Sequence, residues 1–134
     1  MRSEAWLESK FDDLWRRYFA DIRRINPVKV KFGRRAKRML GSIRFDRKER
    51  TSTISVNRLL ANLEVPAFVV TGVLAHELVH YASGFNSEHE KKQEYPHLGG
   101  VITKELAWRG LGEVAKLQKK WIHQNWKEFV KKNC

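Results

Sequence analysis

Residues 66–84 read PAFVVTGVLAHELVHYASG, and this stretch decides the fold. Proline suits the first turn of a helix and glycine suits the position just after its end. A helix is therefore expected to begin near Pro66 and to stop at Gly84. Most positions between them are apolar, which is typical of a helix that is buried in a core. His76 and His80 are four residues apart, so they lie on one face of this predicted helix.

Two imidazoles at this spacing can bind one metal ion, and zinc is the ion expected from such a pair. A buried helix with two histidines and a glutamate needs compensation for its polar groups, and a metal ion provides it. Glu77 follows the first histidine, beside the ion. There it can take a proton from water and deliver it to a leaving amine. The pattern predicts His76 and His80 as zinc ligands and Glu77 as the general base of peptide-bond hydrolysis. The alternative is a pair of hydrogen-bonded core histidines.

A catalytic zinc site needs a third protein ligand. The chain has one cysteine, Cys134, so no thiolate cluster is available. His97 is the preferred third ligand, because it stands between a proline and two glycines at the entry to a predicted helix. His89 and a carboxylate remain as alternatives, with Glu105 ahead of Glu94.

The hydrophobic period predicts the remaining elements. A helix is expected over residues 3–25, strands over 28–32, 42–45 and 53–56, a helical turn over 57–63, and helices over 101–109 and 112–131. The three strands are expected to form a small antiparallel sheet. The length of 134 residues suits a single α+β domain, 1–134. His123 is expected on the surface of the last helix.

The order of these elements resembles the SprT-like (Spartan) zinc peptidase domain. Three segments carry the resemblance: Gly41–Phe45, Thr53–Asn57 and Val73–His80. It covers about residues 3–110 and implies a zincin-like fold in which an HExxH helix carries the active site. The family's third ligand opens a His-Gly-x-x-Phe-like segment, and here His97-Leu98-Gly99-Gly100-Val101 fills that place. Many members also carry a cysteine zinc ribbon, which this chain lacks, so it resembles a minimal form.

The resemblance implies a zinc metalloendopeptidase that acts on DNA-associated proteins, including proteins crosslinked to DNA during repair. The net charge of the chain is +12. A basic surface favours nucleic acid, so this charge is consistent with DNA as a partner. Arg34, Arg35, Lys37 and Arg38 are the predicted phosphate contacts. Single-stranded and double-stranded DNA are both open at this point. Further lysines lie in the basic amphipathic helix expected over about 112–131.

Three tryptophans are candidates for stacking on bases, namely Trp108, Trp121 and Trp126, although Trp121 is expected to belong to the core. Tyr81 or a residue of the loop 84–97 is a candidate for stabilising the oxyanion. No secretory signal and no apolar run of membrane-spanning length is present, so an intracellular protein without a membrane partner is expected.

Two other functions are open from the sequence. One is a nucleic-acid-binding module with a structural zinc ion and no peptidase activity. The other is a zinc hydrolase of a non-peptide substrate. Glu77 favours an enzyme, because a purely structural site has no need of a base beside the metal.

Overall fold

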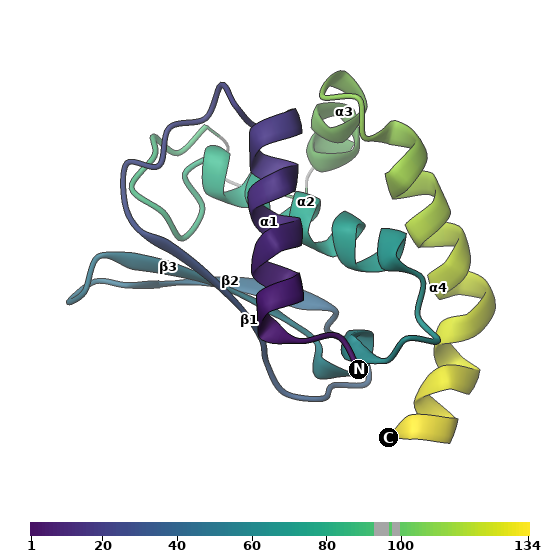
Figure 1. Ribbon diagram of the computed structural model, residues 1–134. Coiled ribbons are helices and arrows are strands. Elements are labelled where there is room, and N and C mark those ends of the chain that lie inside the picture. The colour runs from purple at the N-terminus through teal and green to yellow at the C-terminus, as the bar shows by residue number, and fades with distance from the viewer. Residues whose placement is uncertain (93–96, 98–99) are drawn as a thin grey trace.

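Three strands and the helices that cover one side of them make up the fold, as Figure 1 shows for a computed structural model of the chain. The structure describes residues 1–92, 97 and 100–134. The strands are β1 (Val28–Phe32), β2 (Gly41–Asp46) and β3 (Thr51–Val56). The helices are α1 (Glu4–Tyr18), the short 3-10 helix η1 (Arg58–Ala61), α2 (Ala67–Ala82), α3 (Val101–Trp108) and α4 (Gly112–Asn133). The α+β class with a three-stranded sheet is confirmed.

The sheet is mixed, so the antiparallel arrangement expected from the sequence is wrong. Its strand order is β1-β3-β2, with β3 in the centre. β1 runs parallel to β3, whereas β2 pairs with β3 in the antiparallel direction. The physical reason is the eight-residue connection 33–40, which carries the chain across to the far edge of the sheet. A tight hairpin between β1 and β2 would have required only a few residues.

Apolar and polar residues alternate along the strands, so they lie on opposite faces of the sheet. The inner face packs into the core with residues that include Val30, Ile43 and Ile54. The outer face carries the exposed cations Lys29, Lys31 and Arg44. In Figure 1 the helices lie on one side of the sheet only. The outer face is therefore a solvent-facing surface, as the sequence pattern predicts.

The first helix is shorter than expected, since it ends at Tyr18 rather than near residue 25. Ser3 caps its start as predicted, because the Ser3 hydroxyl accepts a hydrogen bond from the Trp6 amide at 3.0 Å. At the other end the Arg109 guanidinium donates to the Tyr18 carbonyl at 2.8 Å. The Trp15 indole also donates to the Ile22 carbonyl, at 3.0 Å. These side chains satisfy carbonyls that a longer helix would have bonded internally.

The helix α2 lies at the centre of the helical layer and is buried along most of its length. It contacts α1, β2, β3, α3 and α4. Pro66 precedes its first turn, and Gly84 follows its end with a positive φ of 81°. Both ends agree with the prediction. Among the residues that the structure describes, no helix combines the length and the hydrophobicity needed to cross a membrane.

Candidate metal centre

Packing of α2 brings the two predicted ligands to one point. His76 and His80 are one helical turn apart, and their ring centroids are 4.8 Å apart. Their Nε2 atoms approach to 3.1 Å. His80 is only 3% exposed, and its ring packs against Phe85 with a centroid separation of 5.1 Å. The core thus orients this ring.

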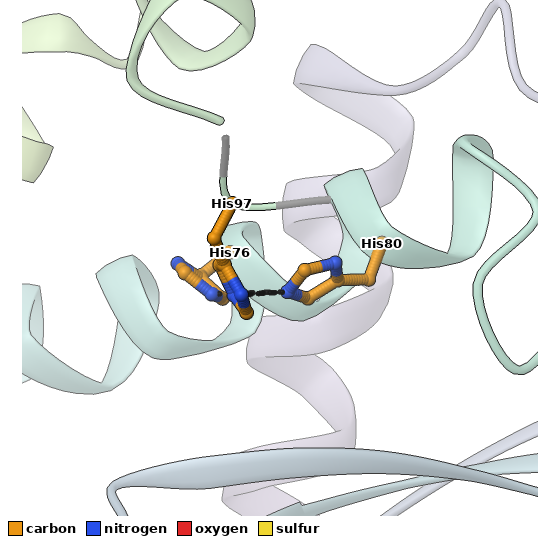
Figure 2. A group of neighbouring side chains, drawn as sticks. All are labelled: His76, His80 and His97. Atoms are coloured by element: carbon orange, nitrogen blue, oxygen red, sulfur yellow. Dashed lines mark hydrogen bonds between the residues drawn. The ribbon is translucent and has the colours of Figure 1, made fainter. Parts of the chain in front are cut away.

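His97 completes the group from the chain segment between α2 and α3. Its Nε2 atom lies 3.1 Å from the Nε2 of His80, and its ring stacks at 27° to the ring of His76. Figure 2 shows the three imidazoles converging, two from the helix and one from the segment above it. All three ligand atoms lie within 4.8 Å of one another. The three histidines are therefore close enough to bind one metal ion.

The donor set suits a metal better than it suits a hydrogen-bond network. Each neutral imidazole carries a single N–H, so three converging Nε2 atoms cannot all be satisfied by one another. A tetrahedral zinc ion with bonds of about 2.0–2.1 Å separates its ligand nitrogens by about 3.3 Å. The observed separations of 3.1 Å from His80 to each of the other two are close to this value. The residues present thus fit a zinc ion.

Burial sets the protonation of the helical pair. It lowers the pKa of His76 to about 4, with a smaller contribution from the charge of His97. It also lowers the pKa of His80 to about 4, helped by the charges of His76 and His97. Desolvation disfavours a charged imidazole in each case. Both rings are consequently neutral at pH 7, which is the form that binds a metal.

Glu77 follows His76 on α2, and only 6% of it is exposed. Burial raises the pKa of this carboxyl from 4.5 to about 7. A carboxyl with a pKa near neutrality is well matched to proton transfer at physiological pH. In the metal-free protein it exists in both forms around pH 7.

The strand β2 contacts α2 at this position through a glycine that the sequence analysis assigned no role. A Cβ atom added to Gly41 would lie 2.5 Å from the Val73 side chain and 3.6 Å from Oε1 of Glu77. Only a residue without a side chain allows β2 to approach α2 so closely. A glycine at the start of a strand that faces the predicted helix is the signal that could have found it. β2 is also an edge strand.

The alternative ligands are engaged elsewhere. His89 Nε2 is 2.7 Å from the Arg23 carbonyl oxygen, and its ring packs against Tyr81. The carboxylate of Glu105 accepts from Arg109 at 2.8 Å. Glu94 lies outside the described residues. In the described part of the chain, the one group of three or more candidate ligands is the histidine cluster.

Tyr81 is not placed to stabilise an oxyanion, although the sequence made it a candidate. Its side chain is fully buried, and its hydroxyl donates to the Asn26 carbonyl at 3.2 Å. This bond fixes α2 against the segment that precedes β1. Most of the loop 84–97 is described, and Ser87 donates to the Tyr81 carbonyl at 2.7 Å. Tyr81 is thus a structural residue.

The predicted nucleic-acid contacts lie away from the histidines, on the connection between β1 and β2. All four of these residues are exposed there, namely Arg34, Arg35, Lys37 and Arg38.

The predicted stacking residues are divided among different surroundings. Trp108 on α3 is 75% exposed, whereas Trp121 packs its ring edge-on against Phe129 and Trp126 stacks on the same ring. His123 is exposed on α4, as expected.

Comparison of the chain with models of known protein families, with curated proteins and with solved structures gives no match.

Proposed function

We propose that the protein is a zinc-dependent metalloendopeptidase of the SprT-like kind, in which His76, His80 and His97 hold the metal ion. The observation that carries this proposal is the convergence of three imidazole nitrogens at a helix that also carries the buried carboxyl group of Glu77. A catalytic zinc site combines three protein ligands with an open fourth position. A bound zinc ion would supply Lewis acidity, which polarises a scissile carbonyl and makes water acidic near neutral pH.

Glu77 is proposed to be the general base. Its carboxylate accepts the proton of the attacking water, and the resulting carboxylic acid then donates this proton to the leaving amine. The raised pKa of Glu77, about 7, matches both halves of that cycle. The buried position of the side chain shields it from bulk water. A structural metal site has no use for such a group.

The edge of β2 near Gly41 supports a peptide as the substrate, whereas the Ile43 carbonyl further along this edge accepts a hydrogen bond from the Asn86 amide at 2.9 Å. β2 is at the end of the strand order, and Gly41 at its start approaches the carboxylate of Glu77. An extended peptide can add to an exposed edge by main-chain hydrogen bonds. A chain bound in this way would pass close to the general base. Proteins on DNA are the substrates that the SprT-like resemblance implies, and the net charge of +12 fits them.

Cleavage of an unfolded protein by the zinc-loaded chain tests this proposal. Glu77→Gln should keep one zinc ion per chain, because its side chain is not a ligand. Its rate of cleavage should fall by about two to four orders of magnitude, since the proton transfer is lost. Glu105→Gln is the matched control, because it removes a carboxylate that pairs with Arg109 instead. It should retain both zinc and activity.

Equal cleavage by the wild type and Glu77→Gln would contradict the mechanism. Full zinc binding with no cleavage by the wild type would favour a structural metal site.

A further inference from the structure

The outer face of the sheet holds a groove that the candidate metal centre does not use. Its volume is about 850 Å³, and it extends from the β1–β2 connection across β3 to β2. Four of its fifteen lining residues are cationic, and a single one, Asp46, is acidic. The cations are Lys31, Arg34, Arg35 and Arg44. No ion pair of these four side chains is found in the described part of the chain, so their charge faces solvent.

The floor of the groove is suited to phosphate groups. Ser42, Thr53 and Ser55 line it from adjacent positions on β2 and β3. Hydroxyl side chains at such positions can donate to phosphate oxygens, while arginines at the walls neutralise the charge. Met39, which is 60% exposed, adds an apolar contact at one side. The surface thus combines a positive charge, hydrogen-bond donors and a small apolar area.

The basic wall is held in a fixed shape by a buried side chain. Asn57 is 4% exposed, and its amide donates to the carbonyls of Ala36 and Met39 at 2.7 and 2.9 Å. From α4, the Trp126 indole donates to the Lys37 carbonyl at 2.7 Å. These bonds fix the backbone of the connection that carries Arg34 and its neighbours. A preorganised surface loses less conformational entropy when it binds a ligand.

From these observations we propose that this groove binds the backbone of single-stranded nucleic acid. Readout of the bases of a duplex requires an element that protrudes into its major groove, which is about 12 Å wide, whereas the feature here is itself concave. A single strand can lie along a positively charged groove and expose its bases to apolar side chains. The net positive charge of the lining favours an anionic ligand over a neutral or a cationic one.

The location of the groove has a consequence that rests on the proposed peptidase function. β2 presents Ser42 and Arg44 to the groove, and its first residue, Gly41, approaches Glu77 on α2. A strand of nucleic acid in the groove would therefore be separated from the candidate base by one β-strand. Proteins carried by that strand would be held near the metal centre.

Fluorescence anisotropy with a labelled single-stranded oligonucleotide of about 16 nucleotides tests the groove directly. The variant Arg34→Ala/Arg44→Ala removes one cation from the connection and one from the strand. It should weaken binding at low salt by about 10- to 100-fold. The slope of log K against log salt should become shallower by about 1.4, since each phosphate contact to a single strand contributes about 0.7.

Arg23→Ala/Lys104→Ala is the matched control, because it removes the same charge from two exposed positions. Arg23 belongs to the segment that follows α1, and Lys104 belongs to α3. This segment and α3 lie at the end of the molecule opposite to the β1–β2 connection (Figure 1). This variant should bind the oligonucleotide like the wild type. Circular dichroism should show that both variants keep the wild-type fold. Removal of metal with a chelator should leave the binding unchanged, so a failure of the zinc site would not affect this result.

Several results would overturn the proposal. These are equal weakening by the two double variants, unchanged binding by Arg34→Ala/Arg44→Ala, or tighter binding of a duplex of the same sequence. A fourth such result concerns membranes. It is that the protein binds phosphatidylcholine vesicles that contain about a third phosphatidylserine but does not bind the oligonucleotide.

Discussion

The helical and the non-helical ligands of the candidate metal centre reach the same point by different means. His76 and His80 are positioned by α2, which is packed between the sheet and the other helices. His97 is exposed, and its contacts at the centre are with the two helical histidines. The core therefore fixes one half of the site, namely the helical half that is formed by His76 and His80 on α2. The other half, His97, is held by its contacts with these two rings.

Removal of single ligands is expected to have the largest effect. Structural zinc sites with four ligands bind with about 10–16 kcal/mol, so one ligand accounts for about 3 kcal/mol, or about two orders of magnitude in affinity. His80→Ala and His97→Ala should both lose this much when zinc binding is measured by competition with a chelating dye. His89→Ala is the control and should bind like the wild type.

Stability of the metal-free variants separates the two halves of the site. His97→Ala should leave the free energy of unfolding within about 0.5 kcal/mol of the wild type, because an exposed side chain contributes little. His80→Ala should lower it by more, since this ring packs in the core. Equal stability of the two variants would contradict the comparison.

Because the carboxyl group of Glu77 on α2 is buried, we expect the metal-free protein to lose stability as the pH rises. Burial raises the pKa of Glu77 from 4.5 to about 7, so the folded state favours the protonated form. The associated stability is complete below pH 4.5 and is lost as the pH rises through about 7. At pH 8 the metal-free Glu77→Gln variant should be more stable than the wild type by up to about 3 kcal/mol.

Urea unfolding at pH 4.5 and at pH 8 measures this difference. Zinc should reduce it, because a nearby cation favours the carboxylate. A wild type that is as stable as Glu77→Gln at both pH values would show that Glu77 is not desolvated.

A smaller effect on stability is expected where β2 contacts α2. Gly41→Ala places a Cβ atom 2.5 Å from the Val73 side chain, and such overpacking costs about 1–3 kcal/mol. Gly112→Ala is the control, since the nearest atom to its new Cβ is at 3.6 Å. Thermal unfolding should show a lower midpoint for Gly41→Ala alone. If both variants unfold at the same temperature, β2 does not pack closely on α2.

Local patterns predicted most of the elements. Pro66 and Gly84 delimit α2 in the structure as they do in the sequence, and Ser3 caps α1. The direction of strand pairing could not be predicted, because alternation shows which residues face the core and not which strand is the neighbour. The end of α1 was also missed, because its last carbonyl is satisfied by Arg109, which is 91 residues away.

The helical half of the site was also predictable, because a local pattern determines it. The spacing of His76 and His80 determines their common face, whereas the third ligand depends on how a loop returns to the helix. The sequence therefore left His97, His89 and Glu105 open. The structure brings His97 to the pair, and it places His89 beside Tyr81 and Glu105 beside Arg109. The approach of Gly41 to Glu77 is a tertiary contact that no local pattern contains.

X-ray absorption at the zinc edge of the zinc-loaded protein tests the central claim most directly. We expect a shell of three imidazole nitrogens at about 2.0–2.1 Å and one oxygen that does not belong to the protein. His97→Ala should lose one of the three imidazoles, and His89→Ala should keep all three. A shell with two imidazoles and a carboxylate, or one that includes the sulfur of Cys134, would contradict a zinc site of three histidines.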